Sequence, residues 1–120
     1  MIKFTVEFAT KMKLVKCIIR PNKVDDVRDA LEKASVSGMT ITEVRGHGRQ
    51  KGHKAVYRGR EYDVSLLPKT MIEMAVPDTL VDEVIAVIIT SARTGDVGDG
   101  RIWVMNIEEG YNIRSAEKDS

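Results

Sequence analysis

Two glycine-rich segments carry the residues best suited to binding an anion. The first is GHGRQKG at residues 46–52, and the second is TGDVGDGR at residues 94–101. Closely spaced glycines let backbone N–H groups approach an anion, and the basic side chains add positive charge. A basic surface turn would explain the first segment alone, and a helix C-cap at Gly95 would explain part of the second. Because both follow or precede predicted strands, the pair favours a polyphosphate site, to which Arg114 could add a contact.

Residues in a catalytic or metal-binding pattern are scarce. His47 and His53 have no Cys or carboxylate at metal-ligand spacing, so solvated loop histidines explain them better than a metal site. Asp96 and Asp99 fit turn formation better than a catalytic carboxylate pair. Neither a P-loop pattern nor a Ser–His–Asp signature is present. Binding without chemistry is therefore the better hypothesis, and a small ATP-dependent enzyme on the same fold is the alternative.

Length and composition bound the class of protein. The chain has 120 residues, which suits one domain, and its 19 basic and 18 acidic residues leave a net charge of +1. This balance argues against a nucleic-acid binder, and Trp103 alone cannot supply the paired aromatics of an RNA-binding sheet. Cys17 cannot form an internal disulfide, and with Trp103 and the methionines it is expected in the core. Without a membrane span or signal peptide, we expect a soluble protein of a reducing compartment.

Hydrophobic periodicity predicts four strands and two helices. Alternating apolar residues predict strands at residues 13–20, 39–45, 69–76 and 101–107, and apolar residues three and four apart predict helices at residues 24–34 and 81–92. Asn22 is expected to cap the first helix and Gly38 to follow its end, while Pro77 and Asp78 cap the second. The order strand–helix–strand, long loop, strand–helix–strand is a duplicated βαβ unit, which predicts an α+β, ferredoxin-like fold.

The predicted domain covers residues 12–115, with a long loop at about residues 48–68. Residues 1–11 form an extension that is either a further strand or a frayed tail, and Met12 could be an alternative start. Residues 116–120 are expected to be a loose polar tail.

The predicted sheet has two apolar faces. Leu14, Ile18, Met71 and Ala75 alternate with the residues expected to face the core. Two helices can cover only one face of a four-stranded sheet, and a sister subunit is the economical cover for the other. The sequence therefore predicts a homo-oligomer.

Several motifs in this order and spacing resemble the PII nitrogen-regulatory signal proteins. They are TEVRGHGRQKGH at residues 42–53, YRGREY at residues 57–62 and ARTGDVGDGR at residues 92–101, with a further match over residues 13–28. The resemblance runs from residue 12 to about residue 114. It implies a homotrimer of ferredoxin-like subunits that is regulatory rather than enzymatic, acts in the cytoplasm, and binds ATP or ADP in clefts between neighbouring subunits.

The resemblance also implies which residues bind the effectors. Those expected to contact the nucleotide are Ile18, Thr40, Gly46, Gly48, Arg49, Gln50, Ala75, Gly98, Asp99, Gly100, Arg101 and Arg114. With MgATP bound, 2-oxoglutarate would join the metal, and the residues expected around it are Gln50, Lys51, Gly52, Lys69 and Gly98. In this set Gln50 helps to hold the Mg²⁺, and Lys69 pairs with a carboxylate of 2-oxoglutarate.

The long loop is implied to be the readout for target proteins of nitrogen metabolism. An ammonium transporter, which would recruit the protein to the membrane, a glutamine synthetase regulator and a biosynthetic kinase are all candidates. Tyr62 matches the loop tyrosine that some members have nucleotidylated, and an unmodified contact residue is the alternative. Asn112 stands where the family usually has an arginine, and losing one charge-assisted contact could cost roughly 1.5–3 kcal/mol. Asn22 and Arg60 also depart from common family residues.

Overall fold

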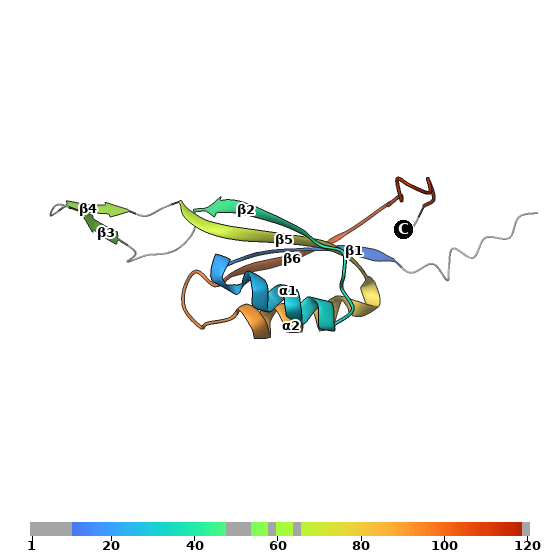
Figure 1. Cartoon of the computed structure of the whole chain (residues 1–120), viewed down its shortest axis with the longest axis horizontal. Coiled ribbons are helices and arrows are strands. Elements are labelled where there is room, and N and C mark those ends of the chain that lie inside the picture. Colours follow the sequence, from blue (N-terminus) through green and yellow to red (C-terminus); the bar gives the residue numbers. More distant parts are fainter. Residues whose placement is uncertain (1–10, 48–53, 58–59, 64–65, 119–120) are drawn as a thin grey trace, which may run out of the picture.

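The structure is a computed structural model that describes residues 11–47, 54–57, 60–63 and 66–118. Its elements are β1 (Met12–Ile19), a 3-10 turn (Pro21–Lys23), α1 (Val24–Lys33), β2 (Thr40–Gly46), β3 (Lys54–Tyr57), β4 (Arg60–Asp63), β5 (Leu67–Pro77), a 3-10 turn (Asp78–Leu80), α2 (Val81–Ala92) and β6 (Gly100–Asn106). Four strands form an antiparallel sheet in the order β2-β5-β1-β6 (Figure 1). The predicted α+β, ferredoxin-like fold is confirmed.

The core lies between one face of this sheet and the two helices. Every second residue of β1 is buried from Val15 to Ile19, and β5 buries Ile72, Met74 and Val76 on the same face. The helices contribute the residues that their three-to-four spacing predicts, which are Val27, Leu31, Val84, Ile88 and Ala92. Cys17 is free and buried among them, as predicted, and this burial raises the pKa of its thiol to about 11.

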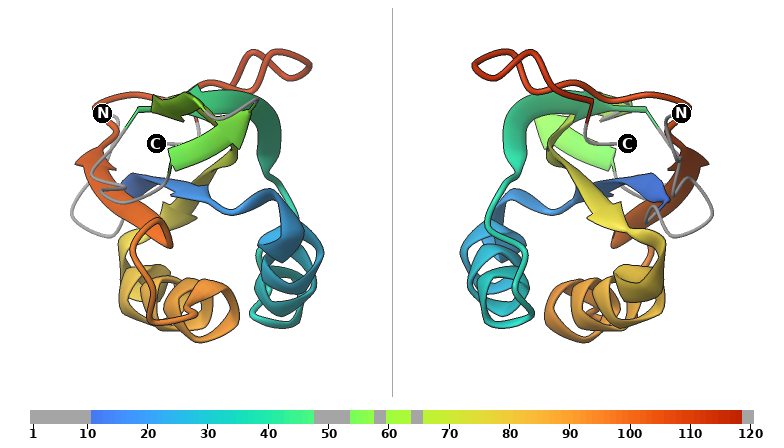
Figure 2. Two further views of the ribbon diagram at one scale, coloured as in Figure 1. Left: turned by 90° about the vertical axis from the view of Figure 1, so that its left-hand side faces the viewer. Right: turned by 90° about the vertical axis from the view of Figure 1, so that its right-hand side faces the viewer.

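Both helices lie on the same side of the sheet, so no helix of the described residues covers its other face (Figure 2). We call this the open face. The strand register puts Leu14 opposite Ala75 and Ile18 opposite Met71 there, which confirms the predicted second apolar face. An ion pair between Lys16 and Glu73 at 3.8 Å lies among these residues.

Trp103 belongs to the open face rather than the core, so that prediction was wrong. The register pairs Trp103 with Lys16 and Met105 with Leu14, and the two side chains remain 42% and 41% exposed. Their apolar character suggested burial, but the alternation of β6 turns them away from the helices. The open face therefore carries more large apolar side chains than the sequence analysis had assigned to it.

The helix ends differ from the predicted caps. Asn22 does not cap α1, because it lies within the 3-10 turn that precedes the helix, and Asp78 likewise lies in the 3-10 turn before α2; no side-chain cap hydrogen bond forms at either start. Helix α1 ends at Lys33, and it is Ser35, at φ +70°, rather than Gly38 that takes a left-handed conformation after it. In both cases a 3-10 turn that begins at or just after a proline leads into the helix, in the place where a capping side chain was expected.

The segment between β2 and β5 is only partly a loop. Strand β2 continues to Gly46, β5 begins at Leu67, and β3 pairs with β4 in a separate two-stranded sheet drawn beyond the ends of β2 and β5 (Figure 1). The long loop expected at about residues 48–68 therefore contains a two-stranded hairpin at residues 54–57 and 60–63. The choice between strand and tail for residues 1–11 lies outside the described residues, apart from Lys11.

The chain after β6 folds back on itself. Tyr111 forms a bridge with Lys118, and the N–H of Ala116 donates to the carbonyl of Asn112 at 2.8 Å. The expectation of a loose tail is therefore wrong for residues 116–118. Within the described part of the chain, no helix is long and apolar enough to cross a membrane.

Candidate functional site

The second glycine-rich segment forms a turn, residues 94–100, between α2 and β6. We call it the glycine turn. Gly98 and Gly100 have φ angles of +103° and +113°, which side-chain-bearing residues rarely adopt. A Cβ on Gly100 would lie 1.7 Å from the backbone oxygen of Ile18, so only glycine fits where β6 begins. The glycines thus allow the chain to reverse tightly against β1.

Asp99 holds the glycine turn together from inside. One carboxylate oxygen accepts hydrogen bonds from the N–H groups of Thr94 and Gly95 at 2.9 and 2.8 Å, and the other accepts from the Thr94 hydroxyl. The second oxygen also receives Nε of Arg20 at 3.1 Å. The Thr94 hydroxyl, the two N–H groups and Arg20 together hold the pKa of Asp99 well below its usual range.

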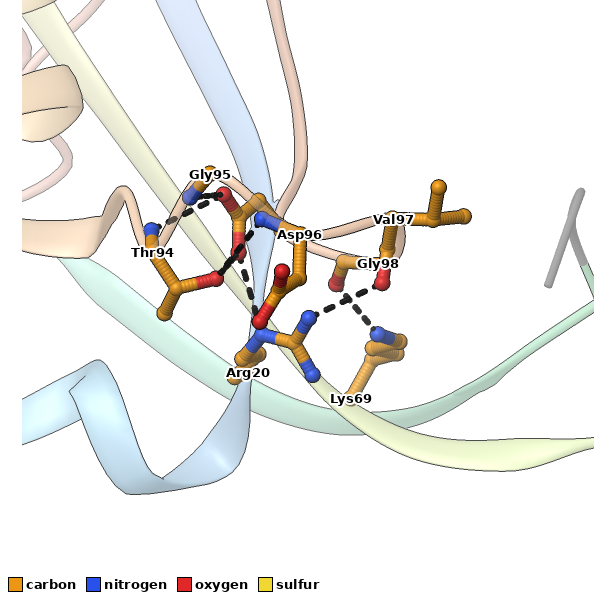
Figure 3. A network of polar contacts seen from close by, with 8 residues as sticks. Arg20, Lys69, Thr94, Gly95, Asp96, Val97 and Gly98 are labelled. Atoms are coloured by element: carbon orange, nitrogen blue, oxygen red, sulfur yellow. Dashed lines mark hydrogen bonds and ion pairs between the residues drawn. The ribbon is translucent and has the colours of Figure 1, made fainter.

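Two cations reach the glycine turn from the sheet (Figure 3). Arg20, directly after β1, donates from Nη2 to the carbonyl of Val97 at 2.9 Å, and Lys69, on β5, donates from Nζ to the carbonyl of Gly98 at 2.6 Å. Partial burial lowers the pKa of Lys69, and nearby Arg20 lowers it further, while Asp99 opposes the shift. This concentration of positive charge around exposed backbone suits an anionic ligand.

Open space adjoins both sides of this end of the sheet. A hollow of about 390 Å³ beside Lys69 is lined by Arg45 and Thr70 among others, and one of about 410 Å³ beside Arg101 is lined mainly by apolar residues of α2 and β6. Small ligands could therefore reach both Lys69 and Arg101.

Seven of the residues predicted to bind effectors meet at this end of the sheet. Ile18 lies opposite Arg101 in the register, and Gly46 lies so close to Lys69 that a Cβ there would be 3.1 Å from Cγ of the lysine. The members of this group, which we call the turn end, are Ile18, Gly46, Lys69, Gly98, Asp99, Gly100 and Arg101.

Three other predicted residues lie at the opposite end of the same sheet. Ala75 is four residues along β5 from Met71, the partner of Ile18, which corresponds to about 13 Å. Thr40 starts β2 opposite Glu73, and exposed Arg114 belongs to the segment after β6, drawn in red at the far end from the glycine turn (Figure 1). We call Thr40, Ala75 and Arg114 the far end. One protomer does not bring the two ends together.

Further predicted residues lie outside the described residues, namely Gly48, Arg49, Gln50, Lys51 and Gly52. Tyr62 belongs to β4, opposite Ala55. Asn112 uses its side-chain oxygen to accept the N–H of Ser115 at 3.1 Å, which stabilises the turn containing Arg114.

Arg20 and Thr94 were missed by sequence reasoning, although both hold the glycine turn. Arg20 follows a strand and precedes Pro21, and a lone arginine at a strand end gives no local indication of a partner 79 residues away. Thr94 opens the TGDVGDG segment, where a threonine five residues before an aspartate is a weak indication of a side-chain-closed turn.

No cluster of three or more His, Cys, Asp or Glu residues that could hold a metal ion is found in the part of the chain that the structure describes.

A duplicated βαβ unit with a cation-bearing glycine turn at one sheet end defines a small α+β protein of ferredoxin-like class. The family model described as "Nitrogen regulatory protein P-II" matches residues 12–117, and the chain belongs to this family. It is similar to the Nitrogen regulatory protein P-II of Haemophilus influenzae, with 53% identity over 90% of this chain and 96% of the relative.

Two further relatives agree. The Nitrogen regulatory protein P-II of Rhizobium etli is 52% identical over 91% of this chain and 97% of its own, and Nitrogen regulatory protein P-II 1 of Escherichia coli K12 is 51% identical over 90% and 96%. The resemblance read from the motifs is therefore confirmed. Because the relatives are named as regulatory proteins, the expectation of a nitrogen-regulatory signal protein rather than an enzyme is confirmed too.

Proposed function

We propose that this protein senses ATP or ADP together with 2-oxoglutarate, and that it transmits their levels to targets of nitrogen assimilation. The observation that carries the proposal is the turn end, where Arg20, Lys69 and Arg101 gather around a glycine turn whose conformation depends on positive φ angles. Backbone N–H groups and cations arranged in this way favour phosphate groups.

A dicarboxylate beside a triphosphate needs a cation between them. Two anions at close range repel strongly unless a metal ion and basic side chains offset the charge. Gln50 would contribute an amide oxygen to Mg²⁺, and Lys69 would bind a carboxylate of 2-oxoglutarate, with Gly48, Lys51 and Gly52 nearby in the sequence. The bound metal would supply charge neutralisation between the two ligands.

The functional assembly that we propose is a homotrimer with nucleotide sites between subunits. The turn end and the far end are about 13 Å apart along β5, yet both carry residues expected at one nucleotide. If each subunit offers its turn end to one neighbour and its far end to the other, the contact is head-to-tail and can close into a ring. The uncovered apolar open face gives the subunits a surface to bury together.

The segment between β2 and β5 is the proposed readout. Gly46 and Lys69 lie at its two roots, so a ligand held at the turn end acts directly where this segment leaves the sheet. A ligand can shift the segment only through different affinity for its conformations. Proposed partners in the cytoplasm include an ammonium transporter, which would draw the protein to the membrane, or a glutamine synthetase regulator, and Tyr62 is a proposed site of nucleotidylation.

Calorimetric titration tests the proposed effectors. We expect 2-oxoglutarate to bind saturably when MgATP is present and not when it is absent, because the metal and phosphates complete its site. Gln50→Ala and Lys69→Met should abolish this binding and leave the oligomer intact, and Lys33→Met, at the end of α1, is the matched control for loss of a lysine. Equal 2-oxoglutarate affinity with and without nucleotide would contradict the metal-bridged site.

A further inference from the structure

All the carboxylate contacts of Asp99 found in the described residues are internal to the protein. Its two oxygens accept from two N–H groups, one hydroxyl and one guanidinium, which come from Thr94, Gly95 and Arg20. The side chain of Asp99 is 23% exposed, and that of Arg20 26%. A carboxylate that already has four donors has little capacity left for a ligand, and its negative charge would repel a phosphate.

The backbone N–H groups of Gly98 and Asp99, unlike the Asp99 carboxylate, have no partner among the described residues. The carbonyl oxygens of Val97 and Gly98 point to Arg20 and Lys69, at 2.9 and 2.6 Å (Figure 3). In a trans peptide the N–H points opposite to the carbonyl of the preceding residue, so the N–H groups of Gly98 and Asp99 point away from these two cations. No residue of the described chain accepts a hydrogen bond from either N–H group.

We propose that Asp99 is a positioning residue. Its carboxylate fixes the glycine turn through Thr94, Gly95 and Arg20, so that consecutive backbone N–H groups are presented to a phosphate. The carboxylate itself does not contact the nucleotide. The inference rests on the proposed binding of ATP or ADP and deepens it. It assigns to Asp99 a role distinct from the direct nucleotide contact that the family resemblance implies.

Two aspartates in one turn allow the two roles of a carboxylate to be separated. Asp96 is exposed and lies three residues from Asp99, and its carboxylate has no partner among the described residues. Asp96→Asn and Asp99→Asn remove the same charge from the same turn. If charge alone matters, both variants bind ATP more tightly, because each removes repulsion. If Asp99 positions the turn, Asp99→Asn weakens ATP binding while Asp96→Asn does not.

The test is calorimetric titration of both variants and the wild type with MgATP, MgADP and adenosine, the last in competition with MgATP if its binding is weak. We expect Asp99→Asn to lose about tenfold in affinity for ATP and ADP. The asparagine NH₂ group is a donor, and it would face another donor, either Arg20 or the N–H groups of Thr94 and Gly95, in place of a carboxylate oxygen. Asp96→Asn should equal or exceed the wild type. Adenosine, which has no phosphate, should bind equally to all three proteins.

A milder variant guards against misfolding. Thr94→Val keeps the backbone N–H but removes the hydroxyl that donates to Asp99, so it should weaken ATP binding two- to threefold, by roughly half a kilocalorie per mole. Unchanged or tighter ATP binding by Asp99→Asn would overturn the inference, as would an equal loss for ATP and adenosine, which indicates a merely structural role. Failure of the wild type to bind ATP at all would instead overturn the proposed function and the inference with it.

Discussion

Replacing Gly100 with alanine should destabilise the protein more than the same change at Gly38, Gly46 or Gly95. The added Cβ would lie 1.7 Å from the Ile18 oxygen and 2.8 Å from its carbonyl carbon, both backbone atoms that cannot rotate away. To reach even a 3.0 Å separation, the start of β6 must move about 1.3 Å from β1. That movement disrupts the pairing of Gly100 with Ile19 at the end of the strand ladder.

The expected cost follows from two contributions. A left-handed backbone costs a non-glycine residue about 1–2 kcal/mol, and a buried backbone group left without its hydrogen bond costs about 1–3 kcal/mol. We therefore expect Gly100→Ala to lower the free energy of unfolding by about 2–5 kcal/mol.

Two other glycines serve as matched controls. Gly95 also has a positive φ, +95°, but its Cβ would meet nothing within 4 Å, so Gly95→Ala should cost only the backbone term of about 1–2 kcal/mol. Gly38 has neither a positive φ nor a neighbour within 4 Å, and Gly38→Ala should be neutral or stabilise by up to about 1 kcal/mol.

Urea denaturation of the three variants at one protomer concentration measures this series, because the stability of an oligomer depends on concentration. The expected order of stability is Gly38→Ala, then Gly95→Ala, then Gly100→Ala. A Gly100→Ala protein as stable as Gly95→Ala would refute the close approach of β6 to β1.

The remaining predictions concern titration and the open face. Burial raises the pKa of Cys17 from 9.0 to about 11, so the free energy of unfolding should fall as pH rises from 9 to 11. Urea midpoints should show a loss about 2–3 kcal/mol larger in the wild type than in Cys17→Ala. The depressed pKa of Asp99 stabilises the fold above pH 3.8, so the wild type should lose more stability below pH 4 than Asp99→Asn, with Asp96→Asn as the control. Leu14→Glu should dissociate the oligomer in light scattering, whereas Ile89→Glu on α2 should not; an intact Leu14→Glu oligomer would exclude the open face from the interface.

Periodic packing explains which parts of the fold were predictable. The spacing of Val84, Ile88 and Ala92 has one interpretation, a helix with one buried face, and α2 follows it. Strand β1 was predictable because Val15, Cys17 and Ile19 recur at every second position, and these three residues are the buried ones. The second apolar face of the sheet could also be inferred, because Leu14, Ile18, Met71 and Ala75 alternate with the core residues.

Contacts between distant segments explain most of what was missed. Nothing near Trp103 in the sequence indicates which face of β6 it occupies, because that depends on its register with Lys16 on β1. The 3-10 turns at Pro21 and Asp78 replace side-chain caps, and local preference alone does not distinguish the two. Strands β3 and β4 have four residues each, which is the shortest run over which alternation indicates a strand.

The sequence proposes the candidate site as a set of residues but does not give their arrangement. The glycines and Arg101 favour an anion site by composition, and the family resemblance adds Lys69, Thr40 and Ala75 as expected members. Their division between two ends of the sheet appears only when β5 is paired with β1. Arg20 was missed because its role depends entirely on the distant turn.

The most direct test of the account is whether one nucleotide site needs two subunits. Arg101→Ala disables the turn end and Arg114→Ala the far end, and each variant alone should bind ATP poorly. When the two variants are unfolded together and refolded as mixed oligomers, about a quarter of the sites should combine an intact turn end with an intact far end from its neighbour. Recovery of ATP binding to about that fraction of wild-type sites is the predicted result, and no recovery on mixing, with mixed oligomers present, would contradict a shared site.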